Sequence, residues 1–293
     1  LDRDGRAAGI EARATGGRRR IIRLRAPLIA IAAGTLMTPQ LLRANEIARG
    51  NRHLGRHLTI HPASKVAAEF EERIDCWKGI PQAYGYEGLH DEGIMFEGAS
   101  MPPDLGVTAA PFTGDLMVRY LERYAHVAGY GFMISDTAEG RLLGAPLGRP
   151  LFRYNLTPTD AQRCRRAIAF LARLYLESGA TAVYAMVRSP ENELRSEADV
   201  AAFEARELDP VDIEMMAFHP LGTCRMARAQ DSGVCDVFNA VFGTPGLYVC
   251  DGSVVPTALG VNPQETIMGM ATRLAGHLLG VEFPGRAGAQ RVE

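Results

Sequence analysis

The segment from Gly246 to Leu279 places the strongest constraint on what this chain can fold into. It opens with a short apolar run, Leu247 to Cys250, which ends at Asp251-Gly252 and predicts a buried strand. Asn262 and Pro263 then fit the N-cap and the first turn of a helix. Apolar residues recur on one face of that helix at Ile267, Met270, Ala271, Leu274 and Leu278.

The start of this helix suits a negatively charged group. The first turn of a helix carries free N–H groups and about half a positive charge. A strand end that faces such a helix start makes a site for a developing anion. A capped helix after a core strand also explains Pro263, but it leaves the small-residue run from Gly252 to Gly260 unexplained.

A second marked run lies upstream, from Phe218 to Met226. His219 stands in it between an apolar stretch and Pro220, with Gly222 close behind, so the backbone is restrained as a placed base requires. A histidine in an apolar run is otherwise a core residue. A nucleophilic pair of Cys224 with His219 is a further alternative, although no third orienting group is marked.

The N-terminal residues predict part of an α/β sheet. Residues 6–14 and 19–25 alternate around residues 15–17, which indicates a hairpin. The apolar run from Pro27 to Gly34 predicts a strand buried on both faces of a parallel sheet. A helix with proline in its first turn follows from Thr38. Where such a strand ends in small residues, here Ala33 and Gly34, a ligand can approach the backbone.

The middle region, from about 62 to 205, has an α+β pattern. Strands are expected near 66–70, 93–97 and 131–134, and a capped helix from Thr157 to Gly179. We expect an antiparallel sheet with helices against one face. Residues 188–210 are charged and predict a helical surface segment.

The sequence offers little support for a metal site. His53, His57 and His61 recur every four residues, but Gly55 and the β-type residues after it favour loop and strand histidines. Zinc bound by His219, Cys224, Cys235 and Cys250 would need spacings that match no close-paired ligand pattern. We therefore expect no metal.

Charge and apolar content exclude other classes. The net charge of −2 gives no field that attracts nucleic acid. The longest apolar run, Ala26 to Met37, is too short to span a bilayer. No signal peptide is visible, and the five scattered cysteines favour reduced thiols and a cytoplasmic setting. The chain begins with Leu1 rather than methionine, so its start is not taken as native.

Three motifs carry a family resemblance: Phe218 to Met226, Gly246 to Pro256, and Gly260 to Thr266. Together they resemble the C-terminal signature of the glucose–methanol–choline (GMC) oxidoreductases, nearest the cholesterol-oxidase-like and bacterial alcohol-oxidase-like branches. Residues 26–42 resemble the strand and helix that close the family's FAD domain. The resemblance implies α/β plus α+β architecture: a remnant of an FAD-binding Rossmann-like domain (1–61, with a return at 206–293) and an antiparallel-sheet substrate domain (62–205).

The resemblance also implies an FAD-dependent alcohol oxidase or dehydrogenase. Hydride would pass from the alcohol carbon to flavin N5, with His219 as the base and Asn262 holding the substrate oxygen or the flavin edge. The residues implied at the cofactor are Ala33, Gly34, Asp251, Gly252, Asn262, Pro263 and Gln264. Methionines and aromatics in the middle region suit an apolar alcohol, although a protein core would look the same.

One family element is absent from these 293 residues, the phosphate-cradling GxGxxG motif. The expectation is therefore the C-terminal part of a longer enzyme, which binds FAD weakly without the missing N-terminal segment. The alternative is a non-catalytic fragment or module that binds a ligand or partner on its substrate-domain sheet.

Overall fold

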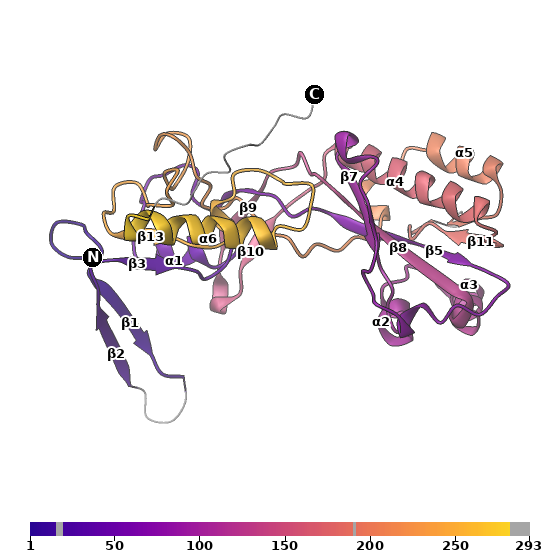
Figure 1. The fold of residues 1–293 in the computed structure, drawn as a ribbon, viewed down its shortest axis with the longest axis horizontal. Helices are drawn as coiled ribbons and strands as arrows, with labels where there is room; N and C mark the ends of the chain where they lie inside the picture. Colours follow the sequence, from indigo (N-terminus) through magenta and orange to yellow (C-terminus); the bar gives the residue numbers. More distant parts are fainter. Residues whose placement is uncertain (16–19, 190–191, 282–293) are drawn as a thin grey trace.

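The computed structural model describes residues 1–15, 20–189 and 192–281, which form two bodies side by side (Figure 1). One body combines both ends of the chain, with a parallel strand pair between them. The other is built on a six-stranded sheet from the middle of the chain. The predicted combination of α/β and α+β parts is confirmed.

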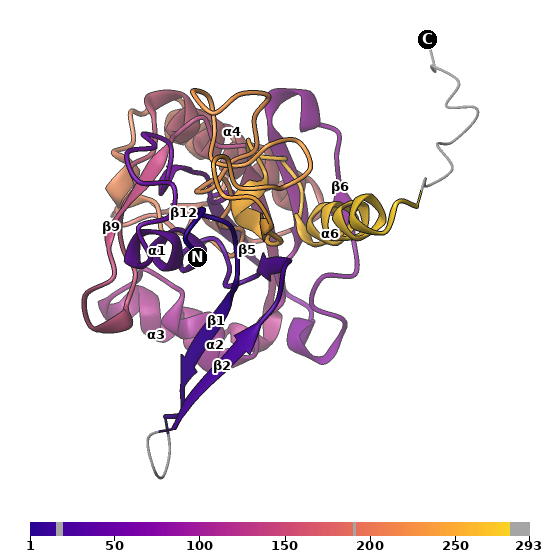
Figure 2. The ribbon, with the colours of Figure 1, turned by 90° about the vertical axis from the view of Figure 1, so that its left-hand side faces the viewer.

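The first body begins with the predicted hairpin of β1 (Gly9–Arg13) and β2 (Ile21–Arg25), which pair antiparallel. Every residue of β2 is exposed, and the hairpin projects away from the rest of the chain (Figure 2). The glycines expected at its turn lie outside the described residues. The alternation thus predicted the hairpin but not that both of its faces would be bare.

The next strand, β3 (Ile29–Ile31), pairs in parallel with β13 (Leu247–Val249), so residues more than two hundred positions apart become neighbours. The predicted helix follows as α1 (Thr38–Ala44). The expectation that this strand is buried on both faces is wrong, because Ala30 is exposed and its neighbours are half-buried. Within the described ranges β13 is the only strand paired with β3, and Ile29 and Ile31 pack one face of β3 against the core of the first body.

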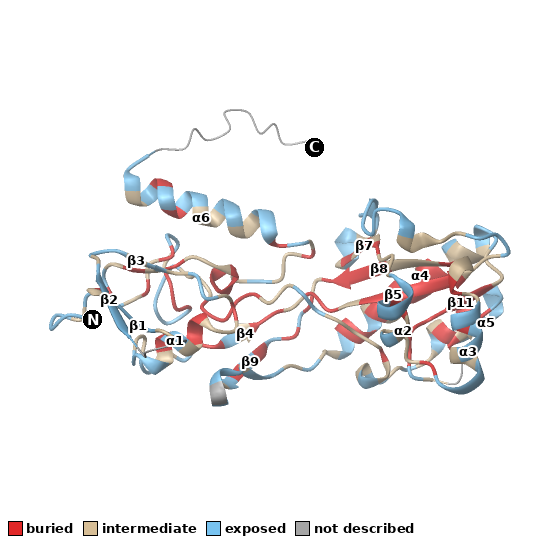
Figure 3. Ribbon diagram, turned by 90° about the horizontal axis from the view of Figure 1, so that it is seen from below, coloured by how far each residue is buried: buried red, intermediate tan, exposed pale blue. Residues whose placement is uncertain are grey.

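The second body holds an antiparallel sheet in the order β12-β11-β5-β8-β7-β6. Its strands are β5 (Ala63–Glu69), β6 (Gly85–Tyr86), β7 (Ile94–Gly98), β8 (Val127–Ile134), β11 (Ala182–Tyr184) and β12 (Glu193–Leu194). Its central strands are largely buried (Figure 3). The three strands expected from the sequence are its central ones.

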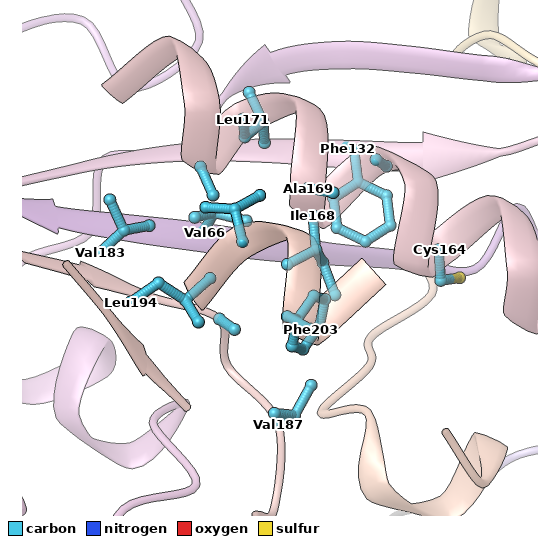
Figure 4. Packing of buried hydrophobic residues seen from close by; sticks show 14 of the residues in the cluster. Val66, Phe132, Cys164, Ile168, Ala169, Leu171, Val183, Val187, Leu194 and Phe203 are labelled. Atoms are coloured by element: carbon cyan, nitrogen blue, oxygen red, sulfur yellow. The ribbon is translucent and has the colours of Figure 1, made fainter. Parts of the chain in front are cut away.

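Helices cover both faces of this sheet, which corrects the expectation of one covered face. On one face α4 (Pro158–Glu177) and α5 (Glu197–Ala205) enclose an apolar core (Figure 4). On the other, α2 (Pro103–Thr108) and α3 (Gly114–Glu122) accompany an aromatic cluster. There the ring of Tyr120 lies 5.3 Å from that of Tyr184. A sheet with apolar side chains on both sides needs cover on both.

The segment 188–210 is not only surface. Val200 and Phe203 of α5 are 0% and 2% exposed and belong to the core shown in Figure 4. Its charged residues bind α4 instead, as in the pairing of Arg173 with Glu204 at 2.7 Å. The charged composition of this segment did not reveal its two buried residues. Val200 and Phe203 are enough to attach the nine-residue helix α5 to the core.

The two bodies share a small sheet. β4 (Arg56–Leu58) pairs with β9 (Gly140–Gly144), which also pairs with β10 (Leu151–Arg153). Short 3₁₀ helices occur at Cys76–Lys78, His90–Glu92, Tyr124–His126, Pro146–Gly148, Pro210–Asp212 and Gly252–Val254.

The last helix, α6 (Gln264–Leu279), begins one residue later than expected: Pro263 holds the N-cap position and Asn262 precedes it. No side chain caps its N-terminus. Leu274 is buried while much of the outer surface is exposed (Figure 3). No helix in the described ranges is long and apolar enough to cross a membrane.

The start of α4 shows how one carboxylate orders two segments. Thr157 Oγ1 accepts from Asp160 N at 3.1 Å and Asp160 Oδ2 accepts from Thr157 N at 3.3 Å, which completes a capping box. Asp160 is 0% exposed and also accepts from the backbone N–H groups of Thr137 and Ala138, at 2.9 and 3.0 Å. The helix start is thereby tied to the segment between β8 and β9.

Replacing Asp160 with alanine should destabilise the protein by about 3 kcal/mol, because two buried N–H donors lose their acceptor at about 1–3 kcal/mol each. Urea unfolding followed by circular dichroism measures the change. Thr159→Ala, at an exposed position in the same turn, is the control and should stay within about 0.5 kcal/mol. Equal stability of the two variants would contradict this role for Asp160.

Candidate active site

The two marked runs are held side by side by their backbones. Cys224 N donates to Ser253 O at 2.8 Å, and Met226 N donates to Val254 O at 2.9 Å. Thr35 adds the N-terminal segment, because its Oγ1 donates to Pro220 O at 2.6 Å. Three stretches that are distant in sequence therefore meet at one place.

Gly222 makes this approach possible. Its φ is +89°, and a Cβ there would lie 2.2 Å from His57 O. Only glycine fits both restrictions. The turn that follows His219 is therefore fixed by sequence, which sets the direction in which the histidine leaves the backbone.

His219 and Asn262 line the same cavity of about 350 Å³, between the sheet of the second body and the converging segments. The wall also carries two ionisable side chains that the sequence did not single out, Lys65 and Glu97. Apolar lining comes from Met101, Phe132, Met216 and Phe218. The cavity is of the size that small-molecule sites use.

The imidazole of His219 is uncharged at neutral pH. Its Nδ1 is buried and has no hydrogen-bond partner, which leaves Nε2 as the nitrogen available to a ligand. Burial lowers the pKa of His219 below its ordinary value of 6.5, because the charged imidazolium is poorly solvated there. At neutral pH the ring is therefore unprotonated and able to accept a proton.

His61 stands directly behind His219 and was not predicted as a site residue. The two rings meet edge to face, 5.5 Å apart, and His61 is 0% exposed. Its Nε2 accepts from Leu259 N at 2.8 Å and Gly260 N at 3.1 Å, so its proton must lie on Nδ1. Burial and the neighbouring His219 lower the pKa of His61 to about 4. His61 thus fixes the loop that leads to Asn262.

Asn262 reaches the cavity next to Glu97 and hydrogen-bonds to it. Burial raises the pKa of the Glu97 carboxyl, and this hydrogen bond opposes the rise. A carboxylate acceptor fixes the amide orientation of Asn262. The amide oxygen of Asn262 then stays available to a ligand in the cavity.

Four of the seven residues expected at the cofactor, Ala33, Gly34, Asp251 and Gly252, lie together after the ends of β3 and β13. Asp251 Oδ2 accepts from Gly34 N at 3.0 Å and from Thr38 Oγ1, while Oδ1 accepts from Ser253 N at 2.9 Å. Gly252 is buried, whereas Ala33 is exposed. Asp251 therefore ties the two strand ends together, with Ala33 and Gly34 at the open rim.

Pro263 is buried and Gln264 is exposed at the start of α6, behind Asn262. Because no side chain caps this helix, its first N–H groups keep their positive partial charge for another acceptor. The anion-friendly helix start expected from the sequence is therefore present next to the cavity.

The structure contradicts a cysteine nucleophile at Cys224. The thiol is 0% exposed, packs in the core of the first body, and has its pKa raised by burial. A buried, protonated thiol cannot attack a substrate. In the part of the chain with described structure, no three His, Cys, Asp or Glu side chains gather as metal ligands.

His53 and His57 lie in the connection before and in β4, as loop and strand histidines. His53 Nδ1 lies 2.8 Å from His57 Nε2, and His57 Nδ1 lies 2.7 Å from Glu139 Oε2. This relay joins the connection to the hairpin of β9 and β10. It does not include the third histidine of the repeat, His61, whose ring packs against His219.

Comparison with known proteins identifies the family. The GMC oxidoreductase N-terminal model matches residues 1–63, and the GMC oxidoreductase C-terminal model matches residues 139–271. The chain belongs to the GMC oxidoreductases, as the three motifs indicated. FAD is the cofactor that the family match and its structural neighbours support.

The relatives include an uncharacterised GMC-type oxidoreductase of Mycobacterium tuberculosis, Rv0492c, which is 32% identical over 94% of this chain and 43% of its own. A long-chain-alcohol oxidase of Arabidopsis thaliana, FAO1, is 26% identical over 91% of this chain and 37% of its own. A formate oxidase structure matches with a TM-score of 0.67 at 16% identity, covering 94% of this chain and 58% of that one. The chain spans less than half the length of both relatives.

Three residues at or beside the cavity were not predicted: Lys65 and Glu97, which line it, and His61, which packs against His219. The sequence predicts the same place for His61 as for the other two histidines of the repeat, that of a loop or strand histidine. The spacing of the three histidines does not show where the chain leads each one in the fold. Lys65 alternates with alanines at positions 63 and 67 on a strand that is otherwise mostly apolar. That isolated charge was a usable signal for a residue facing a cavity.

His61 should make folding stability fall in acid. Its unfolded pKa of 6.5 exceeds its folded pKa of about 4, so its contribution is complete above pH 6.5 and is lost as pH falls toward 4. The total is about 3 kcal/mol. His61→Asn, which removes the titrating imidazole and tolerates the φ of +48°, should flatten this slope.

Urea unfolding at a series of pH values measures the slope. His277→Asn, on the exposed side of α6, controls for the loss of one histidine. An unchanged slope in His61→Asn would show that other groups cause the acid sensitivity.

Proposed function

We propose that this chain carries the substrate side of an FAD-dependent enzyme that oxidises an alcohol. The observation that carries the proposal is the cavity that a neutral, half-buried histidine, His219, and an amide, Asn262, both line. A proton acceptor and a hydrogen-bonding group together suit a hydroxyl substrate.

Features of the chain fit a flavin beside this cavity. Nε2 of His219 is the ring nitrogen available to a bound group, because Nδ1 is buried. A Cβ at Gly34 would meet nothing within 4 Å, so the rim formed by Ala33 and Gly34 is open. The uncapped start of α6, at Pro263 and Gln264, stabilises negative charge. Asp251 and Gly252 keep the strand ends in place beneath it.

The residues then divide the work as follows. Asn262, oriented by Glu97, binds the substrate oxygen. His219 Nε2 accepts the hydroxyl proton, while bound FAD supplies the acceptor for the hydride that leaves the carbinol carbon. His61 stays neutral and keeps His219 and the loop before Asn262 in place. The low-dielectric surroundings that lower the pKa of His219 also strengthen each of these hydrogen bonds.

The alcohol class rests on the family and on the cavity. The Arabidopsis relatives are named long-chain-alcohol oxidases, which supports a CH–OH donor. Met101, Phe132 and Met216 give the cavity apolar surface for the carbon skeleton of a substrate.

We assign the phosphates of FAD to a segment outside these 293 residues. The sequence holds no GxGxxG motif, and β3 has β13 as its sole strand partner among the described residues. In this proposal residues 1–61 and 206–293 complete an FAD domain, and residues 62–205 bind the substrate. A strand from the complementing segment would pair with the free edge of β3.

The purified chain mixed with FAD should retain far less than one flavin per chain after gel filtration, because the phosphate contacts are missing. Absorbance scans of the eluted protein measure this. Stoichiometric flavin that bleaches on addition of an alcohol would contradict the need for a complementing segment. Stoichiometric flavin without any bleaching would favour the non-catalytic binding module.

In a chain completed with the FAD-binding portion of a GMC relative, His219→Ala should lower turnover by about 10²–10⁴-fold, because the proton loses its acceptor. Stopped-flow reduction of the flavin by alcohol measures the step directly. His277→Asn should reduce flavin like the starting protein. Full turnover of His219→Ala would remove the histidine from the mechanism.

A further inference from the structure

The cavity holds a buried ammonium group that the alcohol chemistry does not use. Lys65, on β5, is 5% exposed and lines the same cavity as His219. Its Nζ donates to Gly106 O at 3.3 Å and lies 4.0 Å from Met101 Sδ. No carboxylate of the described residues forms an ion pair with it, so its remaining N–H donors point to no protein anion.

A lysine here is unusual for this chain. The sequence contains 32 lysines and arginines, and only Lys65 and Lys78 are lysines. Lys78 is exposed and pairs with Asp75 at 2.6 Å, as a surface cation does. Every other cation is a larger guanidinium, whereas the cavity carries the compact, flexible ammonium that a small pocket accommodates.

The sheet separates Lys65 from the other charge of the cavity. Lys65 on β5 and Glu97 on β7 are both paired with Gly131 on the strand between them, β8. Directly paired residues share a face of the sheet. The side chains of Lys65 and Glu97 therefore lie on the same face, separated by Gly131, which has no side chain. Two strand spacings place their backbones about 10 Å apart. Gly131 and Ala99, whose Cβ would lie 3.2 Å from a Cβ at Gly131, therefore form the floor of the cavity between a cation and a carboxylate.

The two ends of this floor differ in chemistry. Glu97 is hydrogen-bonded to Asn262, and Asn262 and His219 receive the hydroxyl in the proposed reaction. Lys65 lies at the opposite end, with the half-buried thiol of Cys76 as its titratable neighbour. Burial raises the pKa of Cys76, so the thiol is neutral and does not balance the ammonium.

Lys65 remains mainly charged at neutral pH. Burial lowers its pKa from 10.5 to about 8, which still lies above 7. A buried cation without an anion is costly, and a ligand that brings the anion removes this cost. A ligand carboxylate at the Glu97 end would instead be repelled.

We propose that Lys65 binds a carboxylate of the substrate, so that the substrate is a hydroxy acid whose hydroxyl lies at His219 and Asn262. This inference rests on the proposed function for the position of the hydroxyl. It adds a charged group to the substrate and sets the direction in which it enters the cavity. A plain alkanol fills the apolar surface but leaves the ammonium unpaired.

The two lysines permit a direct test on the full chain. In protein labelled with ¹³C at the lysine ε-carbon, Lys78→Met leaves Lys65 as the single lysine signal. Addition of 6-hydroxyhexanoate should shift this signal and raise its titration midpoint, because the carboxylate stabilises the charged amine. Addition of 1-hexanol, the matched probe without a carboxylate, should leave the midpoint unchanged.

Binding constants from calorimetry complete the test. Lys65→Met should weaken 6-hydroxyhexanoate about 10- to 100-fold, since hydrogen bonds to a charged group are lost, and should leave 1-hexanol unchanged. Lys78→Met should bind both probes like the starting protein. Binding of the hydroxy acid should also weaken as pH rises through about 8, where the free amine loses its proton.

The outcomes separate this inference from the proposed function. Equal binding of both probes by Lys65→Met and the starting protein would overturn the role of Lys65, even if the completed enzyme oxidises alcohols. Lysine-dependent binding of the hydroxy acid without flavin reduction in the completed enzyme would overturn the alcohol chemistry and leave the carboxylate site standing. Unfolding curves of Lys65→Met confirm that the comparison is made on folded protein.

Discussion

The carboxylate of Asp251 is the contact on which the arrangement of the site depends. It ends β13, and it accepts hydrogen bonds from Gly34 N and Thr38 Oγ1 at the end of β3 and from Ser253 N in its own loop. These bonds join residues more than two hundred positions apart. With the strand ends fixed, the backbone of Ser253 and Val254 is in place to receive Cys224 and Met226.

This junction also positions the residues that line the cavity. The run that contains His219 is held by backbone bonds on one side and by Thr35 on the other. Gly222 allows the chain to turn close to His57. His61 then links His219 to the loop before Asn262 through ring contact and two N–H bonds. His219 and Asn262 come from separate segments. Both reach one cavity because the contacts described above hold each segment in place.

The electrostatics of the cavity follow from burial. Both histidines have lowered pKa values and the Glu97 carboxyl a raised one, because each loses solvation of its charged form. Burial also lowers the pKa of Lys65, but its amine keeps its proton at neutral pH. The wall therefore presents an uncharged base at one end and a cation at the other. That asymmetry is what allows a polar substrate to be oriented.

The sequence by itself determined the features that depend on neighbouring residues: the hairpin alternation, the capping box at Thr157 and Asp160, the helix after Pro263, and the motifs around His219 and Asp251. These follow from local periodicity and capping, and the motifs also disclosed the family. Only the tertiary structure decided that α5 buries Val200 and Phe203 and that helices cover both faces of the sheet. It also decided that Lys65 and Glu97 line one cavity and that His61 packs behind His219. The physical reason is strand pairing. The pairing of Lys65 and Glu97 with Gly131 is a register between distant strands, and no local pattern encodes which residues a sheet will place side by side.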